Sequence, residues 1–202
     1  MRTLHGHPLS GHAHRAQLFL SILGLERELV DVDLLAGEQS QPAFRALNAF
    51  GQVPVLVDED GSVVADSNAI LVYLAMKHAP EWLGKDAADA AQVQRWLSVA
   101  AGPIAQGPAA ARLVSVFGVE LDQPALIERS HGLLRVIEAH LAERTWLAIE
   151  RPTIADVAGY TYLAHAPEGG VDLTPYPNVR AWLRRIEDLP GFVPMQASAV
   201  TV

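Results

Sequence analysis

The sequence predicts an α+β fold in two parts: a β-α-β-α-β-β-α unit over residues 1–78 and an all-α region over 88–202, joined by a linker at 79–87. Short apolar runs that alternate with polar residues, as half-buried strands do, all lie in the first part. In the second part apolar residues recur at helical spacing, without a strand pattern. Pro80 and Gly84 interrupt both patterns, so we place the domain boundary in the linker.

The first three predicted elements are a strand, a helix and a second strand. Residues 2–6 form a short run that is compatible with a strand. Apolar residues at helical spacing predict a helix from about residue 12 to residue 23, and Gly24 is a typical helix stop. Residues 28–35 alternate apolar with acidic side chains, which predicts a strand with one buried face.

A helix, a hairpin and a further helix complete the first part. The short helix over 42–48 begins with proline, which is favoured at the first helical position. Residues 53–65 predict a hairpin with a four-residue turn, in which Gly61 can take a positive φ. Asp66 and Ser67 can then cap the helix over 68–79.

The second part is predicted to be helical, with breaks at Gly102-Pro103, at Gly107-Pro108 and around Gly118. Thr153 and Asp156 have the spacing of a capping box, with Asp in place of Glu. The longer helices fall within residues 122–143, 152–166 and 176–189.

Composition excludes several classes of function. The chain of 202 residues has no cysteine, so it has no disulfide, no thiolate metal site and no thiol nucleophile of its own. The net charge of −8 argues against a nucleic-acid partner. No apolar run approaches the length of a membrane span, and the start lacks a signal-peptide core, so we expect a cytoplasmic protein without membrane contact.

Histidines and one serine cluster at the start of the chain, but their spacing favours neither a metal site nor a hydrolase. His5, His7, His12 and His14 do not follow a zinc-binding pattern, so we expect no metal. Ser10 lacks the glycine pattern of a nucleophile elbow. It lies instead where a loop enters a helix, so it can cap that helix or lie beside a bound anion.

Two further places complement Ser10. In Gln52-Val53-Pro54 the proline lies at the start of a strand, and a cis Val53-Pro54 bond would leave the Val53 main chain open to an extended peptide. Asp66-Ser67 forms another helix N-terminus, which can hold a carboxylate. Separately, each motif is explained by an ordinary strand entry or helix cap. Together they predict a groove for a small acidic peptide.

These motifs carry a family resemblance. The segment from Leu47 to Ala75 is LNAFGQVPVLVDEDGSVVADSNAILVYLA, which resembles the glutathione-binding region of the glutathione S-transferase family. PTIADVAGY resembles that family's capping-box motif, and YPNVRAWLRRIEDLPGF resembles its last long helix. The resemblance covers nearly the whole chain. It implies a thioredoxin-like N-terminal domain, an all-α C-terminal domain, a cis Val53-Pro54 bond and a homodimer.

The resemblance also implies roles for individual residues. Ser10 matches the hydroxyl that contacts the glutathione sulfur in serine-type members, with His12 and His14 as further candidates for sulfur contact. Gln39 and Ser40 stand where many members have a His-Lys pair for the glycine carboxylate, so charge-assisted binding is absent there. The residues that match the rest of the glutathione-binding set are Gln52, Val53, Pro54, Asp66 and Ser67.

The implied activity is transfer of glutathione, as co-substrate, to a small apolar electrophile, which suggests a role in detoxification. Tyr73 is the first tyrosine and no cysteine exists, so Ser10 is the remaining candidate for activating the thiol. Alternatives are a glutathione-dependent disulfide reductase or peroxidase, and a non-catalytic glutathione-binding or interaction protein. The residues predicted to line the binding site of the electrophile are Ala100, Ile104, Leu113, Val116 and Phe117.

Overall fold

The computed structural model describes residues 1–199. The chain divides into two compact units. The first comprises Met1–Pro80 together with Pro190–Gln196, and the second comprises Glu81–Leu189 together with residues 197–199 of the described chain. The division between Pro80 and Glu81 falls within residues 79–87, and Pro190–Gln196, which follow the helices of the second unit, belong to the first unit.

The return of the chain to the first unit follows from contacts near its end. The Val193 carbonyl lies 2.8 Å from Nε2 of His14, which is buried in α1 (Gly11–Ile22). Met195 is buried. Gly191 lies so close to Ser21 that an added Cβ would meet the Ser21 carbonyl oxygen. Because these contacts join residues far apart in the sequence, no local pattern predicts them.

A four-stranded mixed sheet forms the centre of the first unit. Its strand order is β2-β1-β3-β4, with β1 parallel to β2 and the other neighbours antiparallel. Leu4 of β1 faces Leu29 on one side and Leu56 on the other. The strands are β1 (Arg2–Gly6), β2 (Arg27–Asp31), β3 (Val55–Val57) and β4 (Val63–Ala65).

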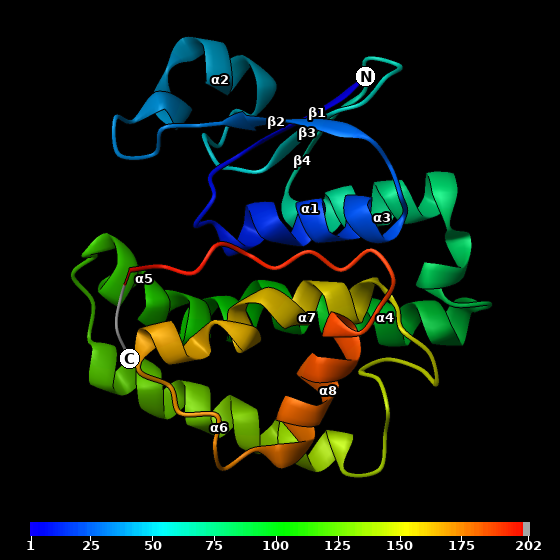
Figure 1. Cartoon of the computed structure of the whole chain (residues 1–202), viewed down its shortest axis with the longest axis vertical. Coiled ribbons are helices and arrows are strands. Elements are labelled where there is room, and N and C mark those ends of the chain that lie inside the picture. Colours follow the sequence, from blue (N-terminus) through cyan, green and yellow to red (C-terminus); the bar gives the residue numbers. More distant parts are fainter. Residues whose placement is uncertain (200–202) are drawn as a thin grey trace. The chain divides into compact units, whose positions relative to one another are not determined.

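Helices cover both faces of this sheet (Figure 1). The helix α1 and α3 (Ser67–His78) lie on one face, and their inward residues, such as Phe19 and Leu71, are fully buried. The short α2 (Pro42–Leu47) lies on the other face, where Phe44 packs with Val32 and Val55. The expected β-α-β-α-β-β-α order is confirmed.

The second strand differs from its predicted extent. It begins at Arg27 and ends at Asp31, whereas alternation predicted residues 28–35. The reason is its single partner: β1 ends at Gly6, directly opposite Asp31. The Val32 N–H still donates to the Gly6 carbonyl at 2.7 Å, but beyond this point no neighbouring strand is available.

The second unit is helical. Its elements are α4 (Ala87–Val99), a π-helical segment (Ala100–Ala109), α5 (Ala110–Phe117), α6 (Gln123–Leu141), α7 (Ile154–Ala164) and α8 (Pro177–Glu187). Short 3₁₀ turns elsewhere in the chain are Glu38–Ser40, Pro80–Leu83 and Ala166–Gly169.

The predicted breaks at Gly102-Pro103 and Gly107-Pro108 are wrong. Both prolines lie inside the π-helical segment, which connects α4 to α5 without a loop. A proline interrupts an α-helix because it lacks an N–H and its ring clashes with a carbonyl one turn earlier. The wider turns of a π-helix, with bonds between residues five apart, accommodate this interruption. Gly118, with φ of 66°, does end α5.

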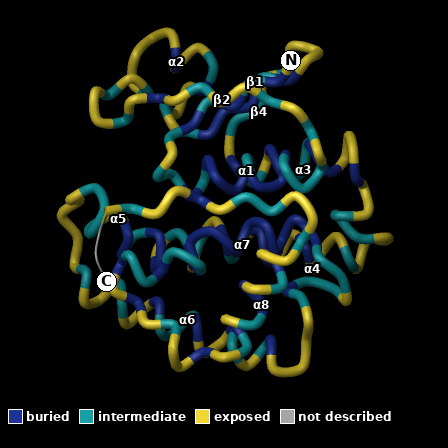
Figure 2. Tube along the Cα trace, in the orientation of Figure 1, coloured by how far each residue is buried: buried dark blue, intermediate teal, exposed yellow. Residues whose placement is uncertain are grey.

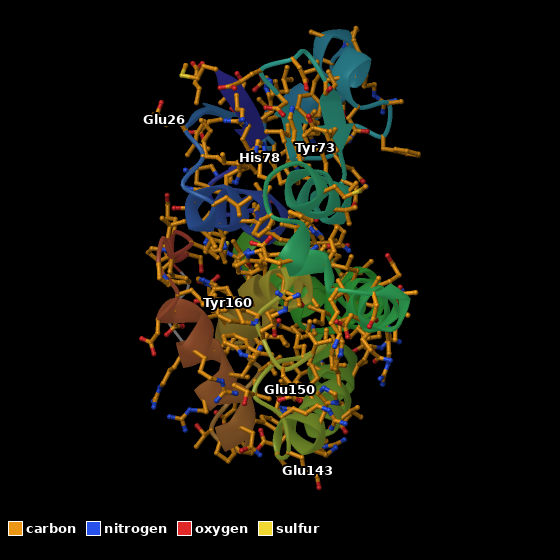
Figure 3. The ribbon with its side chains drawn as sticks, turned by 90° about the vertical axis from the view of Figure 1, so that its right-hand side faces the viewer. Glu26, Tyr73, His78, Glu143, Glu150 and Tyr160 are labelled. Carbon is orange, nitrogen blue, oxygen red and sulfur yellow. The ribbon has the colours of Figure 1, made fainter. Side chains whose placement is uncertain are left out.

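The helix α7 forms the core of the second unit and is buried along nearly its whole length (Figure 2). Its N-terminus has the predicted capping box between Thr153 and Asp156. Tyr160, marked in Figure 3, donates from its hydroxyl to Glu187 of α8 at 3.0 Å. No helix among residues 1–199 is long and apolar enough to cross a membrane.

Candidate functional site

A cavity of about 460 Å³ lies within the first unit. Its walls come from the first turn of α1, the segment between β2 and α2, the loop before β3, the end of β4 and the start of α3. The residues that line it are His12, Leu34, Gln39, Asn48, Phe50, Gly51, Gln52, Val53, Pro54, Ala65, Asp66 and Ser67.

The structure brings together most of the predicted site residues, but not all of them. Those that line the cavity are His12, Gln39, Gln52, Val53, Pro54, Asp66 and Ser67. Ser10, His14 and Ser40 do not line it. His14 is buried and lies against the Val193 carbonyl, whereas Ser40 is exposed at the end of a 3₁₀ turn.

Ser10 caps α1. Its Oγ accepts a hydrogen bond from the Ala13 N–H at 3.2 Å, and its own N–H donates to the His7 carbonyl. The cap uses a lone pair of the hydroxyl oxygen, so the hydroxyl hydrogen can still be donated to another group. Ser10 is half-buried and lies at the N-terminus of α1, the positive end of the helix dipole, two residues before His12.

The loop before β3 is held by one buried side chain that the sequence analysis missed. Asn48 donates from Nδ2 to the Gln52 carbonyl at 2.8 Å and accepts from the Phe50 N–H at 3.1 Å. The Val53-Pro54 peptide bond is cis. Val53 lines the cavity and precedes the β3 ladder, which begins at Val55, so it is outside the pairing of β3 with β1.

The junction of β4 and α3 supplies an acidic group and a helix N-terminus. Asp66 caps α3 by accepting from the Ala69 N–H at 2.9 Å. Its φ of 75° is in the left-handed region that few residues other than glycine adopt, and such conformations concentrate at functional sites. A carboxylate such as Asp66 can accept from an ammonium group, and the first N–H groups of a helix can donate to a carboxylate group.

A buried arginine connects α1 to the start of α3, where Ser67 lines the cavity. Arg15 is 1% exposed and donates from Nη1 to Ser67 Oγ and to Asn68 Oδ1, both at 2.9 Å. Nδ1 of His12 lies 3.1 Å from the same Ser67 Oγ. Burial, with the charge of Arg15, lowers the pKa of His12 to about 4 although Asp66 opposes this change. His12 is therefore neutral at pH 7.

Gln39 brings polar but uncharged atoms to the cavity. Its Nε2 lies 3.5 Å from the Leu34 carbonyl, and its buried Oε1 has no hydrogen-bond partner in the described chain. Gln39 therefore supplies an uncharged amide, whereas the family that the sequence resembles often has a His-Lys pair at the positions of Gln39 and Ser40. Among residues 1–199 no group of three or more His, Asp or Glu side chains is arranged to hold a metal ion.

Comparison with known proteins decides the family. The model of the glutathione S-transferase N-terminal domain matches residues 9–77, and the model of the C-terminal domain matches residues 108–190. The chain belongs to the glutathione S-transferase family. Glutathione S-transferase 3 of Zea mays is 37% identical over 94% of this chain and 90% of its own length.

Solved glutathione S-transferases share the fold of this family member. The enzyme from Pseudomonas fluorescens aligns with a TM-score of 0.91 at 34% identity, covering 97% of this chain and 99% of that one. Glutathione S-transferase-I, solved with lactoylglutathione bound, aligns with a TM-score of 0.81 at 29% identity and covers 94% and 95% of the two chains.

The apolar residues predicted for a second substrate all lie in the second unit. Ile104, in the π-helical segment, is fully buried and belongs to the core. Leu113, on α5, is 39% exposed, and Phe117 at the end of that helix is half-buried. Of the other two predicted residues, Ala100 is fully buried and Val116 is half-buried. Leu113, Val116 and Phe117 are therefore the accessible members of the five.

Proposed function

We propose that this member of the glutathione S-transferase family is a glutathione transferase that binds glutathione in the cavity of the first unit. The thiolate of the bound glutathione then attacks a small apolar electrophile. The observation that carries the proposal is the convergence of Gln52-Val53-Pro54 and Asp66-Ser67, from two separate segments, on one cavity. The matches to both family domains support the same activity.

The polar groups of the cavity suit the parts of glutathione in order. Asp66 can hold the ammonium of the γ-glutamyl end, and the first N–H groups of α3 can hold its carboxylate. The main chain of Val53 can pair with the cysteinyl residue, as an added strand would. Gln52 and Gln39 are the side chains available to the glycine end. Because neither side chain is charged, we expect the glycine carboxylate to be bound more weakly than by a His-Lys pair.

Ser10 is the proposed activating group. Lowering the pKa of a thiol by about two units requires about 2.7 kcal/mol of preferential stabilisation of the thiolate. One hydrogen bond to a charged acceptor, together with a helix N-terminus, supplies free energy of this order. The Ser10 hydroxyl can donate that bond without giving up the cap at Ala13, because the cap uses the oxygen.

Steady-state kinetics with glutathione test the proposed activity. The unaltered chain should transfer glutathione to aryl halides or enals. Ser10→Ala should lower kcat/KM by about 10- to 100-fold, and Ser10→Thr, which keeps the hydroxyl, should retain most of it. Ser98→Ala, an exposed serine on α4, is the matched control and should change nothing.

The same assays separate the alternatives. Turnover of a mixed disulfide or a hydroperoxide, without any with electrophiles, would replace the transferase with a glutathione-dependent reductase or peroxidase. Binding of glutathione without turnover would indicate a non-catalytic protein. A homodimer, a cytoplasmic location and a role in detoxification stay predictions of the family resemblance, and light scattering of the purified chain checks the first.

A further inference from the structure

A second cavity, of about 340 Å³, lies within the first unit. It is bounded by β1 and the loop that follows, by α1, by the edge strand β2, and by the end of the segment Pro190–Gln196. This segment runs beside α1 (Figure 1). The second cavity shares no lining residue with the cavity proposed for glutathione.

The two cavities lie on different faces of α1. Ala13 and Gln17 are four residues apart, so they share one face of the helix, and both line the second cavity. His12, which lines the cavity proposed for glutathione, lies about 100° from Ala13 around the helix axis. A ligand in the second cavity would therefore not occupy the place proposed for glutathione.

The walls of the second cavity are mostly apolar. Leu4 and Met195 are buried, and Leu29 of β2, which pairs with Leu4, is 49% exposed. About half of this leucine is therefore not covered by protein. A cavity of about 150 Å³ holds benzene, so about 340 Å³ has room for an apolar body of about two rings. Binding sites for small molecules are typically of this size and mostly apolar, with few polar groups.

Three polar side chains at the second cavity are available to a ligand. Gln17, Asp31 and Gln196 line it, and none of the three makes a hydrogen bond or ion pair through its side chain with residues 1–199. Asp31 is the one carboxylate among the described residues that line the cavity, and none of these residues is lysine or arginine. The negative charge favours a cation, and the oxygens of the two amides can accept from its N–H groups.

The position of Asp31 relates this charge to the apolar wall. Leu29 and Asp31 are two residues apart on β2, so their side chains share a face of the strand. Asp31 pairs with Gly6 of β1, where an added Cβ would lie 2.8 Å from the Cβ of Ala13 in α1. This face of β2 is therefore the one that α1 covers, and the carboxylate lies at the end of the apolar wall that begins at Leu29.

We propose that the second cavity binds a small organic cation, with an apolar body against Leu29 and Met195 and an ammonium group beside Asp31. The inference goes beyond the proposed function, because it uses none of the residues assigned to glutathione. Since Pro190–Gln196 forms one wall, the bound cation would also hold this segment on the first unit.

Three ligands of similar shape and different charge test the proposal. They are 2-(1-naphthyl)ethylammonium, the uncharged 2-(1-naphthyl)ethanol and the anion 3-(1-naphthyl)propanoate. Each is titrated into the full chain without glutathione at pH 7, and the backbone amide signals are followed by NMR. The ammonium ligand should shift the amides of Ala13, Leu29 and Met195 and bind up to about fivefold more tightly than the alcohol. The anion should bind more weakly than the alcohol.

Three variants assign the binding to this cavity. Asp31→Asn should make the ammonium ligand and the alcohol bind about equally. Glu28→Gln is the matched control: it removes the same charge from an exposed position of β2 outside the cavity, and it should keep the preference for the cation. Gln17→Phe should fill the cavity and weaken all three ligands about tenfold or more. Asp31→Asn and Gln17→Phe should leave kcat/KM with glutathione unchanged.

The outcomes for the two sites can be told apart. Equal affinity of the unaltered chain for the three ligands, or amide shifts confined to the cavity proposed for glutathione, would overturn the inference. Unchanged binding of the ammonium ligand by Gln17→Phe would overturn it as well. If the unaltered chain transfers no glutathione, only the proposed function fails, because the ligand titrations are made without glutathione.

Discussion

Gly51 fixes the loop that carries Gln52 and Val53 into the cavity. Its φ is 61°, and an added Cβ would lie 2.8 Å from the carbonyl oxygen of Gln39. Gly51→Ala therefore combines an unfavourable backbone conformation with a close contact to backbone. We expect a loss of about 1–3 kcal/mol in the free energy of unfolding, measured in urea, and weaker binding of glutathione.

Gly132 provides the opposite case as a control. It lies in α6, where an added Cβ would meet only the tip of Arg135 at 3.9 Å. Gly132→Ala should stabilise the chain by about 0.5–1 kcal/mol, because alanine loses less conformational freedom in a helix. Equal effects of the two substitutions would contradict the account of Gly51.

Asp156 joins the loop before α7 to α8. Oδ1 accepts from the Leu147 N–H and from Nε1 of Trp182, and Oδ2 accepts from the Thr153 N–H. Asp156→Asn would direct an amide NH₂ at one of these donors. We expect the free energy of unfolding at pH 7 to fall by about 2–3 kcal/mol in urea titrations. Asp188→Asn, on the exposed end of α8, should change it by less than about 0.5 kcal/mol.

At the scale of elements, a network of ion pairs attaches the β3-β4 hairpin to α3. Asp58, which is 3% exposed, accepts from Lys77 Nζ and the Tyr73 hydroxyl, both at 2.7 Å, and pairs with Arg2 Nε at 2.8 Å. Tyr73 is marked in Figure 3. Burial alone would raise the pKa of Asp58, but hydrogen bonds from Lys77, Tyr73 and the Glu59 N–H, with the charge of Arg2, lower it to about 2.

This network makes stability depend on pH in acid. Because the pKa of Asp58 is lower in the folded chain than in the unfolded one, its contribution is complete above about pH 4 and is lost as the pH falls through about 2. The difference in unfolding free energy between the unaltered chain and Asp58→Asn should shrink from pH 5 to pH 2. A constant difference over that range would show that the charge of the Asp58 carboxylate does not contribute to the free energy of unfolding.

The chain end gives a prediction at the scale of the molecule. Pro190–Gln196 belongs to the first unit, to which His14 and the burial of Met195 attach it. A chain ending at Leu189 should therefore have a lower Tm, and the amides of α1 should exchange hydrogen faster. A chain ending at Gln196, which keeps this segment, should leave the exchange of the α1 amides unchanged. Unaltered exchange in α1 after the longer truncation would show that the segment does not stabilise this helix.

Local patterns predicted the parts of the molecule that depend on neighbours in the chain. The β3-β4 turn with Gly61 at φ of 84° and the capping box at Thr153 follow from residues a few positions apart. The π-helical passage through Pro103 and Pro108 was missed, because the rule applied to proline holds for α-helices. Within the cavity the motif residues were predicted. The roles of Asn48 and Arg15 were not, because they depend on contacts that folding alone creates.

The central claim is that the cavity binds glutathione and that Ser10 stabilises its thiolate. The most direct test is a calorimetric titration with reduced glutathione, for the unaltered chain and Ser10→Ala, with thiolate absorbance followed across pH. The account predicts binding in both, with the pKa of the bound thiol lowered by about two units in the unaltered chain and returned toward its free value in the variant. No binding at millimolar glutathione, or the same lowered pKa in both proteins, would contradict it.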